Sequence, residues 1–389
     1  MKKVCVATGT RAEYGLLRPL IKKIDNDEEL QLQLVVTGMH LSPEFGLTYQ
    51  EIELDGFEIT ERNEMLLSSD TSNGITKSVG LGTIGFADIF TRITPDIVVI
   101  LGDRYEAFAA ATAAMINRIP IAHIHGGELT EGLIDESIRH SITKMGILHF
   151  TTTEKYRKRV VQLGEQPDRV FCVGALGVEN IKTQTLMDKQ KLEKNIGFNL
   201  DMPYVLVTFH PVTLEDNTAK DQFKQLLRAL NSMKGYKIIF TKANADMDGR
   251  IVNQMIDAYV SENKEKAVAF ASLGMIRYLS AVKYCDMVVG NSSSGIIEVP
   301  SFHIPTINIG DRQRGRMRGK SVIDCDCTSK EITAAIRTAQ MMNNCGILLN
   351  EDNPYEGTDT SGTILRRIKE YLEAGVDMKK NFYDIEWGN

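Results

Sequence analysis

The chain has 389 residues, of which 43% are hydrophobic and 25% are charged, and its formal net charge at neutral pH is −6. This length and composition predict two globular domains, each large enough to bury a core. The negative balance argues against a nucleic-acid binder, although a local arginine cluster can still hold a small anion inside an acidic protein.

The six cysteines indicate reduced thiols in a cytosolic protein. Cys325 and Cys327 form C-x-C without a second pair, so a zinc site is not indicated. The apolar run that begins at Lys3 is too short for a signal peptide and meets Arg11 at once. Because no run approaches about 18 apolar residues, we expect a cytoplasmic protein without a membrane span.

Short β-branched runs alternate with helix-like stretches along the chain. Runs in the first half predict strands at residues 3–8, 32–37, 96–103, 119–124, 146–153 and 169–174. Runs in the second half predict strands at residues 204–210, 236–241, 267–272, 286–290, 305–310 and 321–326. The alternation predicts βαβ units in parallel sheets, and the nearly continuous apolar runs predict strands covered on both faces.

The two series of strands are separated by residues 175–203, which are polar and lack a strand pattern. Helices are predicted at 154–164 and 221–233 from their apolar faces. We therefore predict an α/β protein with two doubly wound, Rossmann-like domains facing a cleft, and a boundary near 174–180. Because ligands of such sheets lie beyond the carboxyl ends of the strands, the residues after each strand are the candidates for a site.

The first predicted strand leads into 8-TGTRAEYG-15, where a helix N-terminus and Arg11 could bind an anion. This turn matches neither the dinucleotide-binding glycine motif nor the phosphate loop of ATPases. The strand at 96–103 ends in Asp103 and Arg104, which could form an ion pair or belong to a site.

The stretch 123-HIHGGELTEGLIDESIRH-140 is the densest polar segment of the first half. His123 and His125 alternate with an isoleucine, so they point to opposite faces if the strand continues. Asp135 fits a helix N-cap or first turn, where its charge suits the helix dipole. Two histidines with nearby acids could ligate zinc, but an acid–base site explains the same residues.

In the second half, His210 follows a strand and precedes Pro211, a place where a histidine can contact phosphate or be structural. The segment 290-GNSSSGIIE-298 predicts a strand-to-helix turn whose N–H groups and hydroxyls can cradle phosphate. Glu298 is expected in the first turn of the following helix, where it can accept hydrogen bonds from a ribose diol. After the next strand, three arginines could reach a diphosphate: Arg312, Arg314 and Arg316.

Together these segments resemble the hydrolysing UDP-N-acetylglucosamine 2-epimerases of bacterial sialic acid and capsule biosynthesis. The resemblance extends over almost the whole chain and rests on 8-TGTRAEYG-15, 101-LGDRYEA-107, 121-IAHIHGGE-128, 134-IDESIRHSITKM-145, 209-FHPVT-213, 290-GNSSSGIIEVPS-301, 307-INIGDRQRGR-316 and 382-FYDIE-386. It implies the GT-B fold, with a sugar-side domain at 1–175, a UDP-side domain at 176–363, and a C-terminal helix and tail at 364–389 that cross back to the first domain.

The resemblance also implies the reaction. UDP-N-acetylglucosamine would lose UDP by elimination to 2-acetamidoglucal, and water would then add to give free N-acetylmannosamine. No cofactor and no metal would take part. The expected partner is the UDP-sugar, not nucleic acid or a membrane, and the family resemblance suggests a homodimer or homotetramer.

The family resemblance also implies roles for individual residues of this chain. The residues implied for catalysis are Asp103 and Asp135 as acids, Arg104 to orient them, His210 to help UDP depart, and Glu128 or His125 as a further acid–base group. The residues implied for UDP binding are Arg11, His210, Asn244, Ser292, Ser293, Gly295, Glu298 and Arg312.

The sequence departs from the wider family at two places. Some members have a catalytic glutamate where this chain has His125. Either His125 or Glu128 would then take the acid–base role, and we favour Glu128. A lysine common in the first helix is absent, because the matching region is Gly15, Leu16 and Leu17, so arginines must balance the phosphate charge.

Three alternatives remain open at this point. The same motifs occur in hydrolysing 2-epimerases that act on UDP-N,N'-diacetylbacillosamine in legionaminic acid biosynthesis. A GT-B glycosyltransferase would need an acceptor pocket and a basic or apolar membrane-facing patch, which we do not find in the sequence. A nucleotide-sugar binding protein would not need Asp103 and Asp135, both of which are present.

Overall fold

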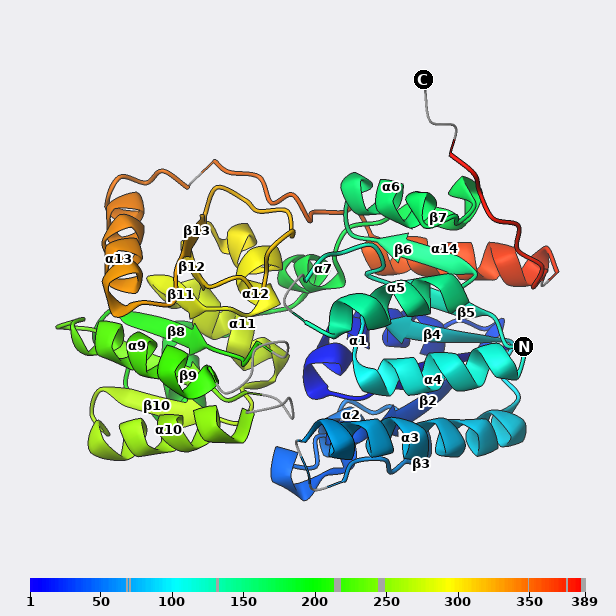
Figure 1. Ribbon diagram of the computed structural model, residues 1–389, viewed down its shortest axis with the longest axis horizontal. Coiled ribbons are helices and arrows are strands. Elements are labelled where there is room, and N and C mark those ends of the chain that lie inside the picture. Colours follow the sequence, from blue (N-terminus) through cyan, green and yellow to red (C-terminus); the bar gives the residue numbers. More distant parts are fainter. Residues whose placement is uncertain are drawn as a thin grey trace. The chain divides into compact units, whose positions relative to one another are not determined.

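The computed structural model describes residues 1–67, 69, 71–130, 133–212, 218–243, 249–348, 350–375 and 377–385. The chain divides into two compact units. Unit 1 comprises Met1–Glu128, Asp135–Asn180 and Tyr355–Asn389, and unit 2 comprises Leu129–Ile134 and Ile181–Pro354. Each unit contains one parallel sheet with helices on both faces, as Figure 1 shows.

Unit 1 contains a seven-stranded sheet in the order β3-β2-β1-β4-β5-β6-β7. All pairs along it are parallel. The strands are β1 (Lys2–Thr8), β2 (Leu30–Thr37), β3 (Ile59–Asn63), β4 (Ile97–Leu101), β5 (Ile121–Ile124), β6 (Leu148–Thr151) and β7 (Val170–Cys172). The helices are α1 (Arg11–Asp25), α2 (Tyr49–Leu54), α3 (Ser72–Ile93), α4 (Tyr105–Ile116), α5 (Asp135–Met145), α6 (Glu154–Gln162) and α14 (Thr360–Glu373), with short 3₁₀ turns η1 (Gly38–Leu41), η2 (Pro43–Phe45) and η3 (Pro167–Arg169).

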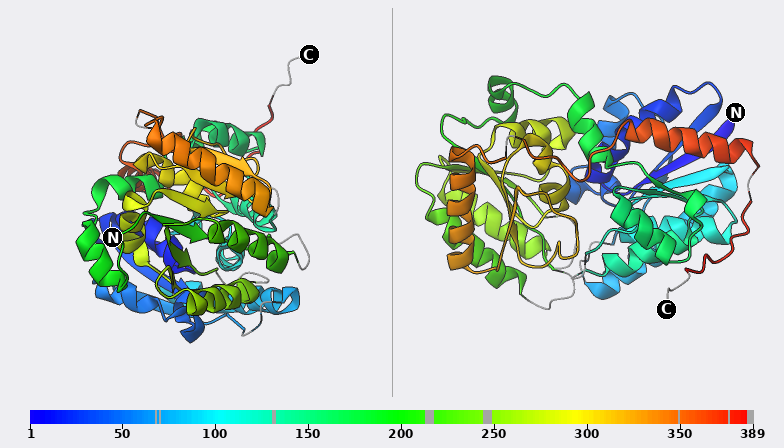
Figure 2. Two further views of the ribbon diagram at one scale, coloured as in Figure 1. Left: turned by 90° about the vertical axis from the view of Figure 1, so that its left-hand side faces the viewer. Right: turned by 90° about the horizontal axis from the view of Figure 1, so that it is seen from above.

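Alternate residues of β1 explain why its apolar run is continuous. Val4 and Val6 join a core cluster with α1 and α14, whereas Cys5 and Ala7 join a second cluster with α3 and α4. Successive side chains of a strand point to opposite faces, so a strand covered on both faces needs apolar residues throughout. Figure 2 shows α14, from the end of the chain, on unit 1.

Unit 2 contains a six-stranded parallel sheet in the order β10-β9-β8-β11-β12-β13. The strands are β8 (Tyr204–Thr208), β9 (Lys237–Thr241), β10 (Ala267–Phe270), β11 (Met287–Gly290), β12 (Thr306–Ile309) and β13 (Val322–Cys325). The helices are α8 (Lys189–Ile196), α9 (Ala219–Asn231), α10 (Gly249–Glu262), α11 (Gly274–Tyr284), α12 (Ser293–Ile297) and α13 (Ser329–Asn344), with the 3₁₀ turn η4 (Val299–Phe302); α7 (Leu176–Thr183) spans the boundary between the units.

The predicted fold class, α/β with two doubly wound Rossmann-like domains, is confirmed. In each sheet the chain winds outward from the first strand in one direction and then in the other. The strand order therefore reverses between β1 and β4 in unit 1, and between β8 and β11 in unit 2. Such reversal points open a crevice at the carboxyl ends of the strands, where ligands of this fold class bind.

One strand of the structure, β3, was not predicted from the sequence. The segment ITERN forms the edge strand β3, whose residues are mostly exposed or half-buried. An edge strand is covered less completely than a central one, so Glu61 and Arg62 can occupy positions where a central strand would need apolar side chains. Because β3 lacks an apolar run, its sequence does not indicate a strand.

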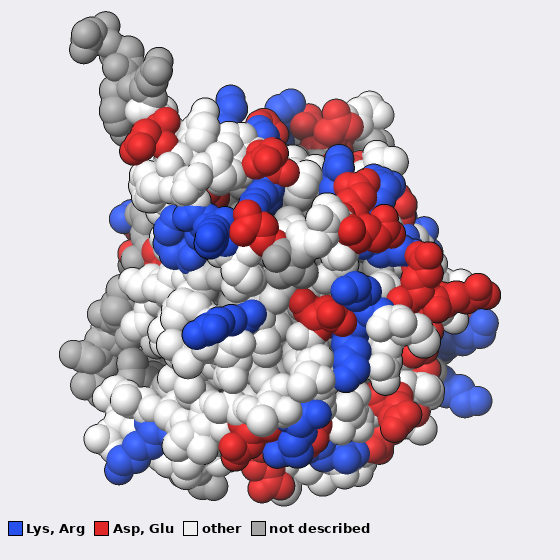
Figure 3. All heavy atoms as spheres, turned by 90° about the vertical axis from the view of Figure 1, so that its right-hand side faces the viewer, with Lys and Arg blue, Asp and Glu red and all other residues white. Residues whose placement is uncertain are grey.

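Figure 3 presents a face of unit 1 on which lysine and arginine side chains are interspersed with aspartate and glutamate. Of the helices within the described residues, none combines the length and the apolar character that crossing a membrane requires.

Candidate functional site

The polar residues predicted in unit 1 follow three neighbouring strands. Arg11 begins α1 after β1, Asp103 and Arg104 follow β4, and His125 and Glu128 follow β5. Because these parallel strands are adjacent, their carboxyl ends lie at one edge of the sheet. The predicted site residues of unit 1 are therefore gathered at its reversal point and the next strand.

Arg139 of α5 is the residue that connects these segments. Its guanidinium forms an ion pair with Asp103 and a second with Glu136, where Nη1 lies 2.8 Å from Oε2. The same Nη1 also donates to the backbone carbonyl of Glu128 at 2.8 Å. Only 1% of this side chain is exposed, so its charge depends on these acidic and carbonyl partners.

Asp135 is the first residue of α5, one turn before Arg139, as its predicted place at a helix start requires. Negative charge is favoured at this end of a helix. Arg139 thus lies on the helix that carries one candidate acid and binds the side chain of the other, Asp103.

Arg104 binds Glu106, and not Asp103, the neighbouring carboxylate that it was predicted to orient. Its Nε donates to Glu106 at 3.1 Å, and Glu106 is almost completely buried. The ion-pair partner that the structure gives Asp103 is Arg139, not its chain neighbour. The cation beside Asp103 is therefore Arg139 from α5, and not Arg104, for which the resemblance implied an orienting role.

A second buried carboxylate, Glu13, lies at the start of α1. It accepts hydrogen bonds from the backbone N–H groups of Gly9 and Thr10, while Thr10 Oγ1 accepts from the N–H of Glu13, which completes a capping box. Burial, reinforced by the nearby charge of Glu106, raises the pKa of Glu13 to about 7. This carboxyl can therefore exchange a proton near neutral pH.

The two histidines of the H-I-H motif have different surroundings. His123 is fully buried, and burial lowers its pKa to about 3. Its Nε2 lies 2.8 Å from the carbonyl of Gly102, to which a neutral ring must donate, and its Nδ1 lies 3.1 Å from Thr143 Oγ1. This ring joins the loop before Asp103 to helix α5 and is held in one tautomer.

His125 lies just past the end of β5 and adopts a left-handed backbone with φ 67°. A residue with a side chain adopts this conformation at a cost, and such residues cluster at functional sites. His125 Nδ1 lies 3.8 Å from Glu128 Oε1. Among the residues that the structure describes, no cluster of three or more histidine, cysteine or acidic side chains could hold a metal ion.

The Glu128 side chain is 2% exposed and is fixed by a hydrogen bond from the residue that follows β6. Its Oε1 accepts a hydrogen bond from Thr152 Oγ1 at 3.0 Å. The side chain is thus fixed next to His125, while its backbone carbonyl is bound by Arg139. His125 and Glu128, the two residues that the sequence offers for the acid–base role, therefore lie close to each other.

In unit 2, the reversal point joins His210 to Asn291. The Asn291 side chain accepts from the backbone N–H of His210 and donates to its carbonyl, both at 2.7 Å. Gly290 precedes Asn291 with φ 141°, and a Cβ there would collide with the carbonyl of Thr208. Glycine therefore allows β8 and β11 to end close enough for one amide to fix the backbone of His210.

The serines occupy the predicted turn between β11 and α12. Ser292 is the N-cap of α12, and its hydroxyl accepts from the N–H of Ser294. Ser293 is the first residue of the helix, and Gly295 is buried against Thr306, whose hydroxyl donates to the Gly295 carbonyl. Gly295 thus serves helix-to-strand packing, since a Cβ would lie 2.7 Å from the Thr306 methyl group.

The predicted place of Glu298 is wrong. Because α12 has five residues, Glu298 is its C-cap and not part of its first turn. Tyr278 donates to Ser294 Oγ at 2.8 Å, and Ser294 in turn hydrogen-bonds the carboxyl of Glu298. Burial raises the pKa of Glu298, and the bond from Ser294 opposes this shift.

The three arginines after β12 have different surroundings. Arg312 donates to the carbonyl of Asn291 at 3.1 Å, Arg316 is buried, and Arg314 lines a cavity of about 560 Å³ at the strand ends. Acidic side chains line the same cavity: Asp311, Asp324, Asp326 and Glu331. Arg312 contacts the reversal point directly, through the carbonyl of Asn291, and Asn291 also lines the cavity of Arg314. The remaining predicted residue, Asn244, lies outside the described residues.

Three residues that connect or fix these segments were not among those predicted from the sequence: Arg139, Asn291 and Glu13. Arg139 and Asn291 lie inside motifs quoted for the resemblance, and each binds a residue far away in the sequence. The signal for Glu13 was available, because threonine followed three residues later by glutamate at a helix start is the capping-box pattern.

The model of the UDP-N-acetylglucosamine 2-epimerase family matches residues 22–369. GDP/UDP-N,N'-diacetylbacillosamine 2-epimerase (hydrolyzing) of Campylobacter jejuni is 47% identical over 325 residues, which cover 84% of each chain. Polysialic acid biosynthesis protein P7 of Escherichia coli is 42% identical over 99% of this chain and 98% of its own. UDP-N-acetylglucosamine 2-epimerase of Neisseria meningitidis is 34% identical over 99% of this chain and 100% of its own.

Solved structures share the fold. The Neisseria meningitidis UDP-GlcNAc 2-epimerase bound to UDP-GlcNAc superposes with a TM-score of 0.77 at 17% identity, covering 95% of this chain and 100% of that one. The Methanocaldococcus jannaschii enzyme in complex with UDP-GlcNAc and UDP gives a TM-score of 0.73 at 18% identity, covering 95% and 99%. With the family model and relatives of this similarity, the chain belongs to the UDP-N-acetylglucosamine 2-epimerase family of enzymes.

Proposed function

We propose that the protein is a hydrolysing 2-epimerase that converts UDP-N,N'-diacetylbacillosamine and water into UDP and the free sugar epimerised at C2. The observation that supports this sugar is the 47% identity to the Campylobacter jejuni protein, which is named for hydrolysing epimerisation of GDP- or UDP-N,N'-diacetylbacillosamine. A Legionella pneumophila protein named for the same hydrolysing activity is 35% identical over 87% of the chain and supports it further.

The proposed reaction has two steps. A base takes the proton from C2, the C1–O bond to UDP breaks, and its electron pair leaves on the diphosphate oxygen while a C1=C2 double bond forms. Water then adds across this bond, with hydroxyl at C1 and a proton delivered to the opposite face of C2. The C2 proton is weakly acidic, so its base must be positioned within hydrogen-bond reach.

We assign the proton transfers to unit 1. Asp103 and Asp135 are the proposed acids, since Arg139 pairs with Asp103 and extends from the helix that begins at Asp135. His125 and Glu128 form the proposed second acid–base group, in which the buried Glu128 orients the imidazole of His125. This pairing replaces the single glutamate favoured from sequence alone.

We assign UDP binding mainly to unit 2. His210 and Arg312 are the proposed diphosphate ligands, both held by Asn291, one through its side chain and the other through its carbonyl. Hydrogen-bond donors fixed before the reaction stabilise the charge that grows on a departing diphosphate. The further proposed ligands are Ser292 and Ser293 for phosphate, Glu298 for the ribose hydroxyls, and Arg11 of unit 1 for the diphosphate.

UDP-N-acetylglucosamine is the second candidate substrate. The Escherichia coli relative named for polysialic acid biosynthesis aligns over nearly the full length of both chains, and the Neisseria meningitidis relative is named for this substrate. The two sugars differ at C4 and C6, away from the C1–C2 bond that the proposed acids act on. The same catalytic residues therefore serve either candidate.

Proton NMR in D₂O with each UDP-sugar tests the proposal directly. We expect UDP and a free sugar carrying deuterium at C2, with the larger kcat/KM for the diacetylbacillosamine nucleotide. A larger value for UDP-N-acetylglucosamine would select the second candidate. Tight UDP binding without turnover of either sugar would contradict a hydrolysing epimerase and favour a glycosyltransferase or a binding protein.

A further inference from the structure

Residues 377–385, here called the C-terminal segment, run along the surface of unit 1 near the end of α5. The backbone N–H of Tyr383 donates to the carbonyl of Gly164 at 2.9 Å, and Gln166 Nε2 donates to the carbonyl of Asn381 at 3.2 Å. The Lys144 ammonium lies over the Phe382 ring, 5.0 Å from its centroid. The segment is thus attached through backbone, amide and aromatic contacts.

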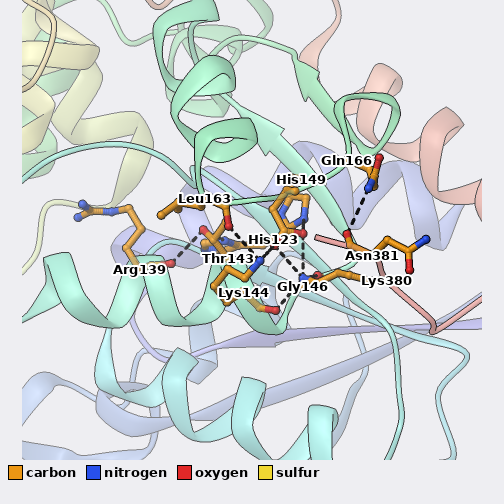
Figure 4. Close-up of polar contacts among 11 residues, drawn as sticks. His123, Arg139, Thr143, Lys144, Gly146, His149, Leu163, Gln166, Lys380 and Asn381 are labelled. Atoms are coloured by element: carbon orange, nitrogen blue, oxygen red, sulfur yellow. Dashed lines mark hydrogen bonds and ion pairs between the residues drawn. The ribbon is translucent and has the colours of Figure 1, made fainter. Parts of the chain in front are cut away.

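Lys380 is the most deeply placed polar residue of this segment. Its ammonium donates to the carbonyls of Lys144 and Gly146 at 2.7 and 2.8 Å, which Figure 4 shows at the C-terminal end of α5. The last carbonyls of a helix lack partners within the helix and carry its negative end. Lys380 supplies both the donors and the charge that this end of α5 requires.

The Lys380 ammonium also forms an ion pair with Glu165. Lys380 Nζ lies 2.9 and 2.8 Å from the two carboxylate oxygens of Glu165, which also accepts from His149 of β6 at 3.0 Å. Burial would raise the pKa of Glu165, but its bonds to His149, Lys144 and Lys380 hold it at about 2. Glu165 is therefore ionised and fixes Lys380 relative to β6.

Apolar and polar contacts together hold α5 in place. Ile142 is buried in a core cluster with α3 and α4, and Ile138 and Met145 pack against that cluster, while the other two buried residues of the helix, Arg139 and Thr143, are polar. Thr143 is tied through His123 to the loop before Asp103, and Arg139 is tied to Asp103 itself. Polar contacts along this helix, which is about 16 Å long at 1.5 Å per residue, and at its C-terminal end therefore add to its apolar packing in setting its position.

We propose that Lys380 is a positioning residue for the reaction: by holding the C-terminal end of α5, the C-terminal segment sets where the other end presents Asp135 and the Arg139–Asp103 pair. The inference rests on the proposed function, because it assumes that these acids act on the sugar. A displacement of about 1 Å in a group that transfers a proton can cost about a hundredfold in rate.

The test compares Lys380→Met with Lys380→Arg and with Lys379→Met. Lys379 is the adjacent lysine with an exposed side chain, so Lys379→Met makes the same chemical change away from α5. We expect Lys380→Met to lower kcat by about tenfold to a hundredfold, with the affinity for UDP unchanged. Lys380→Arg, which keeps a cation and several donors, should restore most of the loss, and Lys379→Met should match the wild type.

Hydrogen exchange over residues 135–145, measured on the same proteins, separates the two proposals. Faster exchange in Lys380→Met alone, together with a lower kcat, supports the positioning role. Absence of turnover of both UDP-sugars by the wild type would contradict the proposed function, and faster exchange in Lys380→Met would then still show that the C-terminal segment holds α5. Equal kcat and equal exchange in Lys380→Met and Lys379→Met would overturn the inference. Faster exchange with unchanged kcat would overturn it as well, because the helix end would then have no effect on catalysis.

Discussion

The two reversal points of this protein have the same strand order but different chemistry. In unit 1, the ends of β1, β4 and β5 carry carboxylates that are paired with arginines: the partly exposed Asp103 with Arg139, and the buried Glu106 with Arg104. In unit 2, the ends of β8 and β11 carry neutral amides and hydroxyls, with Asn291 binding the backbone of His210. One sheet topology thus positions ionisable acids in one unit and neutral hydrogen-bonding groups in the other.

This contrast separates what a fold provides from what residues provide. The reversal of strand order opens a crevice in both units, and it does so whatever side chains follow the strands. The kind of chemistry then depends on whether the strand ends carry ionisable acids with a compensating cation or donors that suit an anion. Variants at the two sites should therefore fail in different ways.

The largest effect is expected at Asp103. We predict that Asp103→Asn lowers turnover by about 1,000-fold, because an amide cannot take or give the proton in the way a carboxyl does. The affinity for UDP, measured by calorimetry, should stay the same if unit 1 supplies chemistry and unit 2 binds UDP. Asp168→Asn, at an exposed aspartate, is the matched control; comparable activity in the two variants would end the distinction between the units.

The next largest effect is expected at Asn291. Asn291→Ala leaves the buried N–H and carbonyl of His210 without this partner, which should lower the free energy of unfolding by about 3 kcal/mol. Urea denaturation reports the change, and affinity for UDP should fall with it. Asn291→Asp keeps an acceptor for the N–H but loses the donor to the carbonyl, so an intermediate loss is expected; no loss in either variant would mean that the amide is dispensable.

A smaller and pH-dependent effect is expected at Glu13. Its pKa in the folded protein, about 7, lies above its value in the unfolded chain, so its favourable contribution is complete at low pH and is lost as pH rises toward 7. Glu13→Gln cannot ionise. Between about pH 5 and about pH 8, the free energy of unfolding of the variant should therefore improve by about 2 kcal/mol relative to the wild type.

Thermal melts at several pH values measure this difference. A parallel pH dependence in the two proteins would show that the Glu13 carboxyl ionises as readily in the folded chain as in the unfolded one.

The smallest effect is expected at Tyr278. Tyr278→Phe removes one hydrogen bond to Ser294, which supports the Glu298 carboxyl, so we predict a loss of about 1 kcal/mol, or about fivefold, in UDP affinity. Turnover at saturating substrate should change little. Tyr284→Phe, a nearby change without this bond, serves as control; equal affinities would exclude Glu298 from nucleotide binding or show that it needs no support.

The sequence was sufficient for the parallel sheets because buried strands such as β1 and β8 leave nearly continuous apolar runs. It was also sufficient for the start of α5 at Asp135, where helix chemistry is local. It could not show β3, whose edge position tolerates charge, or the end of α12 at Ile297, which places Glu298 at the C-cap.

Pairings between distant segments were the hardest to predict. Asp103 is next to Arg104 in the chain, and proximity in sequence suggested that pair. The fold instead brings Arg139 from α5 to Asp103 and leaves Arg104 with Glu106. Which cation pairs with an acid at a strand end depends on the helix that packs beside that end, and a local sequence pattern does not reveal this packing.

The contribution of α14 to the core of unit 1 has a consequence for synthesis of the chain. Ile364, Ile368 and Leu372 pack in one cluster with α1 and β1, yet all of unit 2 except Leu129–Ile134 is translated between the last strand of unit 1 and this helix. Domains tend to fold as they emerge from the ribosome. Here the second unit can finish first, while one apolar face of the first stays uncovered until α14 has been translated, so a nascent chain stalled before α14 should be a preferred client for chaperones that bind exposed apolar surface.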